Sequence, residues 1–194
     1  RDVKYRVTAI GDSITQGCMT DFMAYEFWAA RIAKELGSDY AFWNCGLGWA
    51  RASDCAQKGN WLGRALNSDI MIVAFGTNDI VSGEYGGDGG NNADEVNGYI
   101  STILEQTQVA GCKTILFNAP PQDYDEEHEA VRTALNDMEK QTAEKYGAEY
   151  FDFAAQLSTP ENPAGALYGG HPNGEGGKVV CDAFMKQFAE LFGK

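Results

Sequence analysis

Basic residues are scarce in this chain, and no cluster of them is available to bind a polyanion. Of 194 residues, 15 are Lys or Arg and 28 are Asp or Glu, which gives a formal net charge of −13. Nucleic acids and anionic membranes attract clustered cations, so this balance argues against both as partners. The chain also has no apolar run that approaches the roughly 20 residues needed to cross a bilayer, so we expect no membrane insertion.

Histidines and paired cysteines are also few. There are two histidines, and the five cysteines form an odd set without CxxC or CxxH spacing. A zinc site or a dense disulfide framework is therefore not expected, and nothing in the sequence indicates another metal or an organic cofactor. Free thiols favour a reducing compartment. The chain starts at Arg1, close to its first strand, which is typical of a domain excised from a longer, exported protein. We favour this interpretation over a cytoplasmic protein.

Short apolar segments alternate with helical patterns along the chain. The expected strands cover 7–10, 40–44, 70–75, 114–118 and 149–153, and the expected helices cover 21–36, 93–110, 123–146 and 174–192, with weaker helices in 50–66. Strands that alternate with helices build a parallel sheet covered on both faces. We therefore predict one α/β domain over residues 1–194: a three-layer α/β/α sandwich whose five-stranded parallel sheet has the flavodoxin-like order 2-1-3-4-5.

Four residues with suitable chemistry follow the ends of these strands. Ser13 follows the first strand, Gly46 the second and Asn78 the third, and His171 lies in a loop before the last helix. A serine hydroxyl becomes a nucleophile when a histidine takes its proton, and acyl transfer also needs donors aimed at the developing oxyanion. Each residue alone has a structural explanation, such as a helix cap or a turn. Together they favour acyl transfer, whereas we expect His128, on an acidic helix, to be a solvated surface residue.

Four stretches make the chain resemble the SGNH hydrolase family, also called GDSL-type esterases and lipases. They are GDSITQG (11–17), NCGLG (44–48), GTND (76–79) and HPN (171–173). The resemblance implies a compact α/β/α fold and a serine esterase site. It assigns Ser13 as the nucleophile and His171 as the base, with an oxyanion hole formed by the backbone N–H groups of Ser13 and Gly46 and the side-chain amide of Asn78.

The same resemblance assigns supporting roles to neighbouring residues. By position, Asp12 and Asp79 are expected to hold their turns in shape, and Asn44 and Thr77 to brace the loops. The family usually has a second glycine after the oxyanion glycine, where this chain has Trp49 and Ala50.

The clearest departure from the family is Tyr168, which stands three residues before His171 where an Asp is usual. The carboxylate of a triad orients the imidazole and stabilises its cation, and losing that charge costs about 10⁴ in rate elsewhere. A backbone carbonyl near Tyr168, the carboxylate of Glu161 or the Tyr168 hydroxyl could replace it. We predict a Ser13–His171 dyad in which the main-chain carbonyl orients the imidazole, and we prefer this to orientation by the Glu161 carboxylate.

Three aromatic residues are candidates either for packing in the core or at its edge or for substrate contacts. Trp49, Trp61 and Tyr85 could line the mouth of the crevice, and we single out Trp49 and Tyr85 for stacking on a sugar. Tyr85 lies in the glycine-rich stretch 82–92. A surface loop is expected there, since a calcium loop would need regularly spaced carboxylates.

The expected substrate is a short acyl ester. The chain is too short for an added lid domain or a long acyl tunnel, so we predict a short acyl group. The resemblance to small members of the family implies removal of an acetyl group from a carbohydrate through an acyl-enzyme. A lysophospholipase or thioesterase is the alternative among acyl hydrolases. The missing Asp suggests an alternative of another class, a non-catalytic carbohydrate-binding module on a degraded hydrolase fold. Nothing in the sequence indicates the oligomeric state.

Overall fold

A parallel sheet in the strand order β2-β1-β3-β4-β5 forms the centre of the computed structural model, which describes residues 2–18, 20, 25–58, 61–81, 92–157, 167–168 and 171–194. The strands are β1 (Tyr5–Gly11), β2 (Tyr40–Gly46), β3 (Ile70–Ala74), β4 (Lys113–Phe117) and β5 (Glu149–Phe151). Gly11 pairs with Gly46 on one side and Ala74 on the other, so β1, β2 and β3 end at one edge. The predicted fold class and strand order are confirmed.

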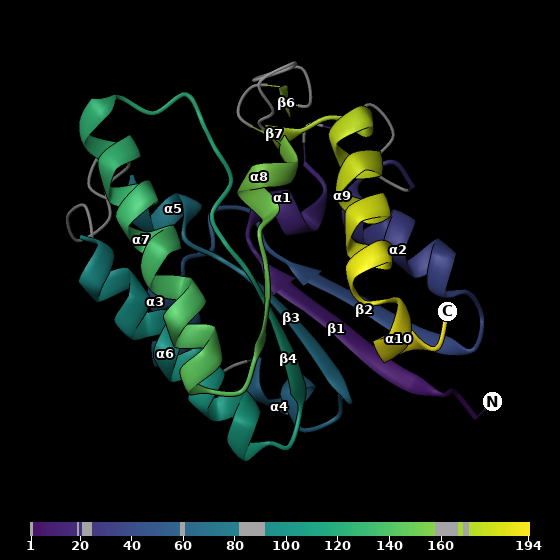
Figure 1. Cartoon of the computed structure of the whole chain (residues 1–194). Coiled ribbons are helices and arrows are strands. Elements are labelled where there is room, and N and C mark those ends of the chain that lie inside the picture. Colours follow the sequence, from purple (N-terminus) through teal and green to yellow (C-terminus); the bar gives the residue numbers. More distant parts are fainter. Residues whose placement is uncertain are drawn as a thin grey trace.

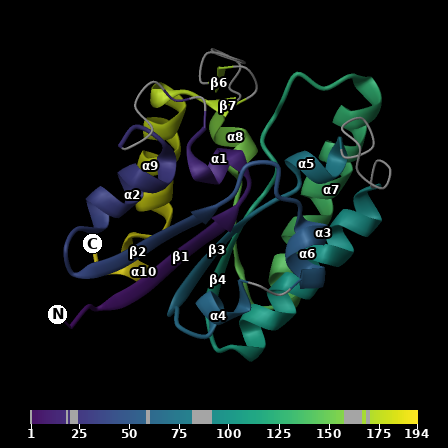
Figure 2. The same ribbon diagram turned by 180° about the vertical axis from the view of Figure 1, so that it is seen from behind.

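Helices cover both faces of this sheet (Figures 1 and 2). One layer contains α2 (Trp28–Leu36), α8 (Phe153–Leu157), α9 (Gly174–Gln187) and α10 (Ala189–Phe192), and the other contains α3 (Ala52–Lys58), α4 (Leu62–Ala65), α6 (Ala93–Val109) and α7 (Glu126–Lys145). The short helices α1 (Ser13–Gln16) and α5 (Thr77–Ile80) and the ribbon of β6 (Leu167–Tyr168) and β7 (His171–Pro172) lie at the carboxyl edge of the sheet, at the top of Figure 1. Segments far apart in sequence therefore meet at that edge.

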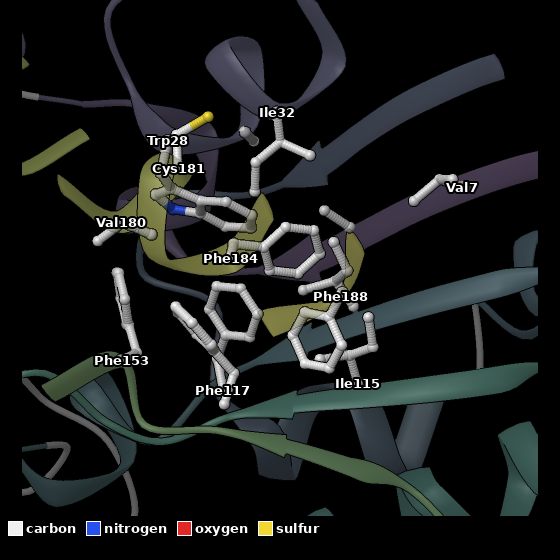
Figure 3. Close-up of a cluster of buried hydrophobic side chains, with 14 of the residues drawn as sticks. Val7, Trp28, Ile32, Ile115, Phe117, Phe153, Val180, Cys181, Phe184 and Phe188 are labelled. Atoms are coloured by element: carbon white, nitrogen blue, oxygen red, sulfur yellow. The ribbon is translucent and has the colours of Figure 1, made fainter. Parts of the chain in front are cut away.

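Alternating side chains of the strands supply two hydrophobic cores. Ile70 and Ile72 of β3 belong to the cluster under α2 and α9, whereas Met71 and Val73 belong to the cluster under α6. The first cluster is rich in aromatic rings (Figure 3), and the ring centroids of Phe117 and Phe151 are 4.6 Å apart. Each buried ring of this size stabilises the fold by roughly 1.5–3 kcal/mol, so the strands that carry the edge residues are firmly anchored. Among the described residues, no helix has the length and apolar character of a membrane span.

The first long helix begins later than predicted. A helix was expected over 21–36, but α2 begins at Trp28, with Phe27 extended at its N-cap; residues 21–24 lie outside the described residues. Packing against α9 is the physical reason. A Cβ on Gly177 would lie 2.2 Å from the Glu26 carbonyl oxygen, so this backbone touches α9 directly, and the Arg31 Nε–H also donates to Glu26 O at 2.8 Å. A longer helix would lose this contact.

Two further helices differ from the prediction. The helix expected from 123 begins at Glu126, because Asp125 caps it by accepting the His128 backbone N–H at 2.8 Å. The helix expected over 174–192 is divided at Phe188 into α9 and α10.

Candidate active site

The residues predicted to carry the chemistry meet at the carboxyl edge of the sheet. Ser13 begins α1, directly after β1, and His171 begins β7, 158 positions further along the chain. The Ser13 Oγ lies 2.9 Å from the His171 Nε2, within hydrogen-bond distance, and the pair is partly buried. This is the contact that a serine nucleophile and its base require.

The serine is presented by a tight turn between strand and helix. Asp12, extended at the N-cap of α1, accepts the Ile14 N–H at 2.8 Å, and Gly17 ends the helix with a φ of +92°. The Trp28 indole N–H donates to the Ile14 carbonyl at 3.2 Å, which ties α1 to α2. Asp12 is 2% exposed, and its burial raises its pKa to about 7, although the Ile14 N–H acts in the opposite direction. Asp12 therefore shapes the turn, as expected.

The histidine lies between a small ribbon and a capped helix. Tyr168 pairs with His171 in the antiparallel ladder of β6 and β7, so the two backbones are neighbours. Asn173 then caps α9 by accepting the Gly176 N–H at 2.9 Å, and the Arg31 guanidinium donates to the Gly174 carbonyl at 3.2 Å. These contacts hold the segment that carries His171 against the main body of the molecule. Glu161, the other candidate for orienting His171, lies outside the described residues.

Gly46 ends β2 in close contact with α1. A Cβ at this position would lie 2.2 Å from the Gln16 backbone nitrogen, so only glycine fits. The Gly46 N–H donates to the Asn44 Oδ1 at 2.9 Å, and the Asn44 Nδ2 donates to the Thr15 carbonyl at 2.9 Å. The bracing role expected of Asn44 is thus confirmed. The oxyanion role of Gly46 stays a prediction and requires that the N–H exchange its present acceptor.

Asn78 lies in α5, directly after β3. Its Nδ2 donates one hydrogen bond to the Ala50 carbonyl at 3.1 Å, and a primary amide has a second proton to offer. Next to it, the Asp79 carboxylate accepts the N–H groups of Ala52 at 2.8 Å and Ser53 at 3.2 Å, which caps α3. Asp79 is fully buried, and this burial raises its pKa to about 6. Asp79 therefore has a structural role, but it fixes the start of α3 rather than its own turn, whose shape it had been expected to hold.

The aromatic candidates for substrate contacts and His128 differ in how far they are buried. Trp49 is 66% exposed on the loop after β2, whereas Trp61 packs on the core under α6 and donates its indole N–H to the Cys55 carbonyl at 2.8 Å. Tyr85 lies outside the described residues. His128 was expected to be a solvated surface residue, but its side chain is largely covered. Its Nδ1 lies 2.8 Å from Asp125 Oδ1, its ring centroid lies 6.4 Å from that of Tyr124, and its side chain is only 19% exposed.

Two residues of this region had no role predicted from the sequence. Gln16 joins α1 to the loop after β2, because its Oε1 accepts the Gly48 N–H at 2.8 Å. Glu139 is completely buried on α7, and its pKa is raised well above the usual range by burial and by the nearby Asp79. Gln16 lies within the stretch GDSITQG but had no predicted role there, and Glu139 belongs to no motif, so it is the contacts that identify both residues. Within the described parts of the chain, no group of three or more His, Cys, Asp or Glu side chains is placed to hold a metal ion.

A serine hydroxyl paired with an imidazole, with a side-chain amide after the neighbouring strand β3 at the same edge of a parallel sheet, is typical of a serine hydrolase. The comparison with known families agrees. The sequence matches the GDSL-like Lipase/Acylhydrolase family over residues 9–179, and the chain belongs to this family. It is therefore a GDSL-type ester hydrolase, and its substrate is an ester. A search of curated proteins found no match to the chain.

Solved structures of other hydrolases have a similar fold. LAE5, an alpha/beta hydrolase from the metagenome of Lake Arreo, has a TM-score of 0.77 at 18% identity, covering 98% of each chain. The M. smegmatis aryl esterase has a TM-score of 0.75 at 20% identity over 96% of this chain and 99% of its own. A catalytic mutant of Axe2, an acetylxylan esterase from Geobacillus stearothermophilus, has a TM-score of 0.72 at 15% identity over 96% and 94%.

Proposed function

We propose that this ester hydrolase removes short acyl groups, acetyl foremost, from a carbohydrate through an acyl-enzyme on Ser13. The observation that carries the proposal is the 2.9 Å separation of the Ser13 Oγ and the His171 Nε2. A non-catalytic binding module would not need this contact, because sugar binding uses neither a nucleophile nor a base.

The reaction follows from the positions of these two groups. The Ser13 Oγ attacks the ester carbonyl carbon while its proton passes to the His171 Nε2, and the carbonyl oxygen becomes an oxyanion. The second proton of the Asn78 amide and the backbone N–H groups of Ser13 and Gly46 are the proposed oxyanion donors. As the C–O bond to the alcohol breaks, His171 returns its proton to the alcohol. A water molecule then repeats the sequence on the acyl-enzyme, and the acid leaves.

We further propose that a main-chain carbonyl orients the His171 ring in place of the usual aspartate. The pairing of Tyr168 with His171 in the β6–β7 ladder supports this, because it brings the backbone of residue 168 beside the histidine. A carbonyl selects the tautomer with a proton on Nδ1, so Nε2 is free to act as a base.

Substitution of the two competing side chains tests this orientation. We expect Glu161→Ala and Tyr168→Phe each to keep kcat within a few-fold of the unaltered enzyme, since neither side chain is the proposed acceptor. A fall in kcat near the 10⁴-fold that follows loss of a triad charge would assign the role to the altered side chain instead.

The preference for a short acyl group is tested with paired esters. We expect kcat/KM for p-nitrophenyl acetate to exceed that for the octanoate, and we expect release of acetate from acetylated xylan, whose backbone is a carbohydrate. Preference for the octanoate would favour a lysophospholipase or thioesterase. Retention on polysaccharide without hydrolysis of any ester would favour the binding module.

A further inference from the structure

The loop after β2 is a tight turn with an unusual backbone. The Ala50 N–H donates to the Leu47 carbonyl at 3.0 Å, which closes a four-residue turn with Gly48 and Trp49 in the middle. Trp49, the third residue, has a φ of +64°, and it is alone among the described non-glycine residues in having a positive φ. Glycine or asparagine normally occupies this position of such a turn, because a side chain crowds the backbone there.

Three hydrogen bonds attach this turn to the catalytic edge. The Leu47 N–H donates to the Gly11 carbonyl at 3.0 Å, at the end of β1. The Gly48 N–H donates to the Gln16 side chain at 2.8 Å, and the Ala50 carbonyl accepts the Asn78 amide at 3.1 Å. The turn thus connects the helix of the nucleophile to the proposed oxyanion amide, and Trp49 lies at its tip.

Burial of the Trp49 side chain contributes little free energy to offset the strain of its backbone. Trp49 is 66% exposed and Leu47 is 65% exposed, whereas Trp28, in the core, is fully buried. A non-glycine residue in the left-handed region costs of the order of 1 kcal/mol. Core packing therefore does not account for a tryptophan here.

We propose that Trp49 determines substrate specificity by stacking its indole face on a sugar ring of the alcohol part of the ester. This inference rests on the proposed function and adds the subsite beside Ser13 that receives the carbohydrate. An aromatic side chain that is 66% exposed suits a pyranose, which presents C–H groups to the ring and hydroxyl groups to water. An acyl chain would instead require an enclosed apolar site.

Steady-state kinetics with two acetyl esters separates this role from catalysis. The first substrate is a mono-O-acetylated methyl β-xyloside, and the second is ethyl acetate, whose alcohol is too small to stack. For Trp49→Ala we expect KM for the acetylated xyloside to rise about tenfold. We expect kcat to change less than twofold and the rate with ethyl acetate to be unchanged, whereas Trp49→Phe keeps most of the affinity.

Two controls exclude a structural explanation. Leu66→Ala removes an equally exposed apolar side chain (65% exposed) just before β3, at the opposite edge of the sheet, and should leave both KM values unchanged. Trp49→Gly removes the ring and also suits the positive φ, so we expect its Tm to be no lower than that of the unaltered protein.

Each outcome has a definite consequence. If the enzyme hydrolyses acetylated xyloside but Trp49→Ala leaves its KM unchanged, or lowers turnover of both esters equally, the stacking role is wrong and the proposed function stands. If the unaltered enzyme hydrolyses ethyl acetate but not the xyloside, the carbohydrate part of the proposed function fails, and the stacking role fails with it.

Discussion

One buried acid, Glu139, lowers the free energy of unfolding of this protein. It is completely buried on α7, and among the described residues neither carboxylate oxygen has a hydrogen-bond partner. Burial, together with the negative charge of Asp79, raises its pKa well above the usual range. The folded protein therefore keeps this carboxyl protonated at pH values where the unfolded chain releases the proton. As pH rises above the usual pKa of a glutamate, this difference favours unfolding.

We predict that Glu139→Gln stabilises the protein, by an amount that grows from pH 5 to pH 8, because glutamine has no proton to lose. Urea unfolding at the two pH values measures the effect. Glu144→Gln, an exposed substitution on the same helix, is the control and should not alter the pH dependence. A gain for Glu139→Gln that is absent or equal at both pH values would contradict the argument.

At the scale of residues, the sequence was enough to propose the reactive residues but not to predict all of their surroundings. Ser13, Asn78 and His171 could be assigned because each follows a recognisable strand end or motif. The φ of Trp49 and the hydrogen bond from Asn44 to the Thr15 carbonyl could not, because both belong to the region where β2 packs against α1. Such distances arise from tertiary packing and leave no periodic signal in the chain.

The short helices at the carboxyl edge hold the site together through their caps. Asp79 of α5 caps α3 through Ala52 and Ser53, and the neighbouring Asn78 donates to the Ala50 carbonyl. A single stretch therefore carries the proposed oxyanion amide and also fixes the loop to which that amide is bonded. A displacement of α3 would alter the position of the amide, and small displacements of catalytic groups are costly.

We predict that Asp79→Ala lowers both stability and turnover. Loss of the cap should cost about 1–2 kcal/mol, and displacement of Asn78 should lower kcat roughly 10- to 100-fold. Asp125→Ala is the matched control, because Asp125 caps α7 by the same kind of hydrogen bond and is exposed. It should lower stability without lowering kcat. Equal kcat for the two variants would show that Asp79 does not position the site.

At the scale of elements, the five strands of the central sheet were predicted better than the helix ends, whereas β6 and β7 were not predicted. The apolar run 70–75 marked β3 because a central strand is buried on both faces. The late start of α2 was missed, because the contact between Glu26 and Gly177 joins segments about 150 residues apart. Apolar spacing indicates that a helix exists, whereas its first residue is decided by such packing.

Across the whole molecule, the excess of negative charge and the buried acids both lower the stability of the folded state as pH rises. The chain has a net charge of −13, and mutual repulsion of this kind disfavours the compact state. Burial raises the pKa of Asp12 to about 7 and that of Asp79 to about 6. Both groups keep their protons in the folded protein when the unfolded chain has lost them, so stability falls as pH rises from about 4 to about 7.

We therefore predict that the protein is more stable at pH 5 than at pH 8, with a difference on the order of a few kcal/mol in the free energy of unfolding. Thermal unfolding followed by circular dichroism across this range measures it. Asp12→Asn keeps an oxygen for the cap and should reduce the slope. A stability that rises towards pH 8 would mean that other groups outweigh the buried acids.

The central claim is that Ser13 is a nucleophile activated by His171, and covalent labelling tests it most directly. A p-nitrophenyl alkylphosphonate transfers its phosphonyl group to an activated serine and releases nitrophenol. We predict that intact-mass spectrometry shows one phosphonyl group per chain, that peptide mapping places it on Ser13, and that esterase activity is lost in proportion. Ser13→Ala should take up none, and His171→Ala should react at least about 10²-fold more slowly. A label on another residue, or full activity after Ser13 is labelled, would contradict the account.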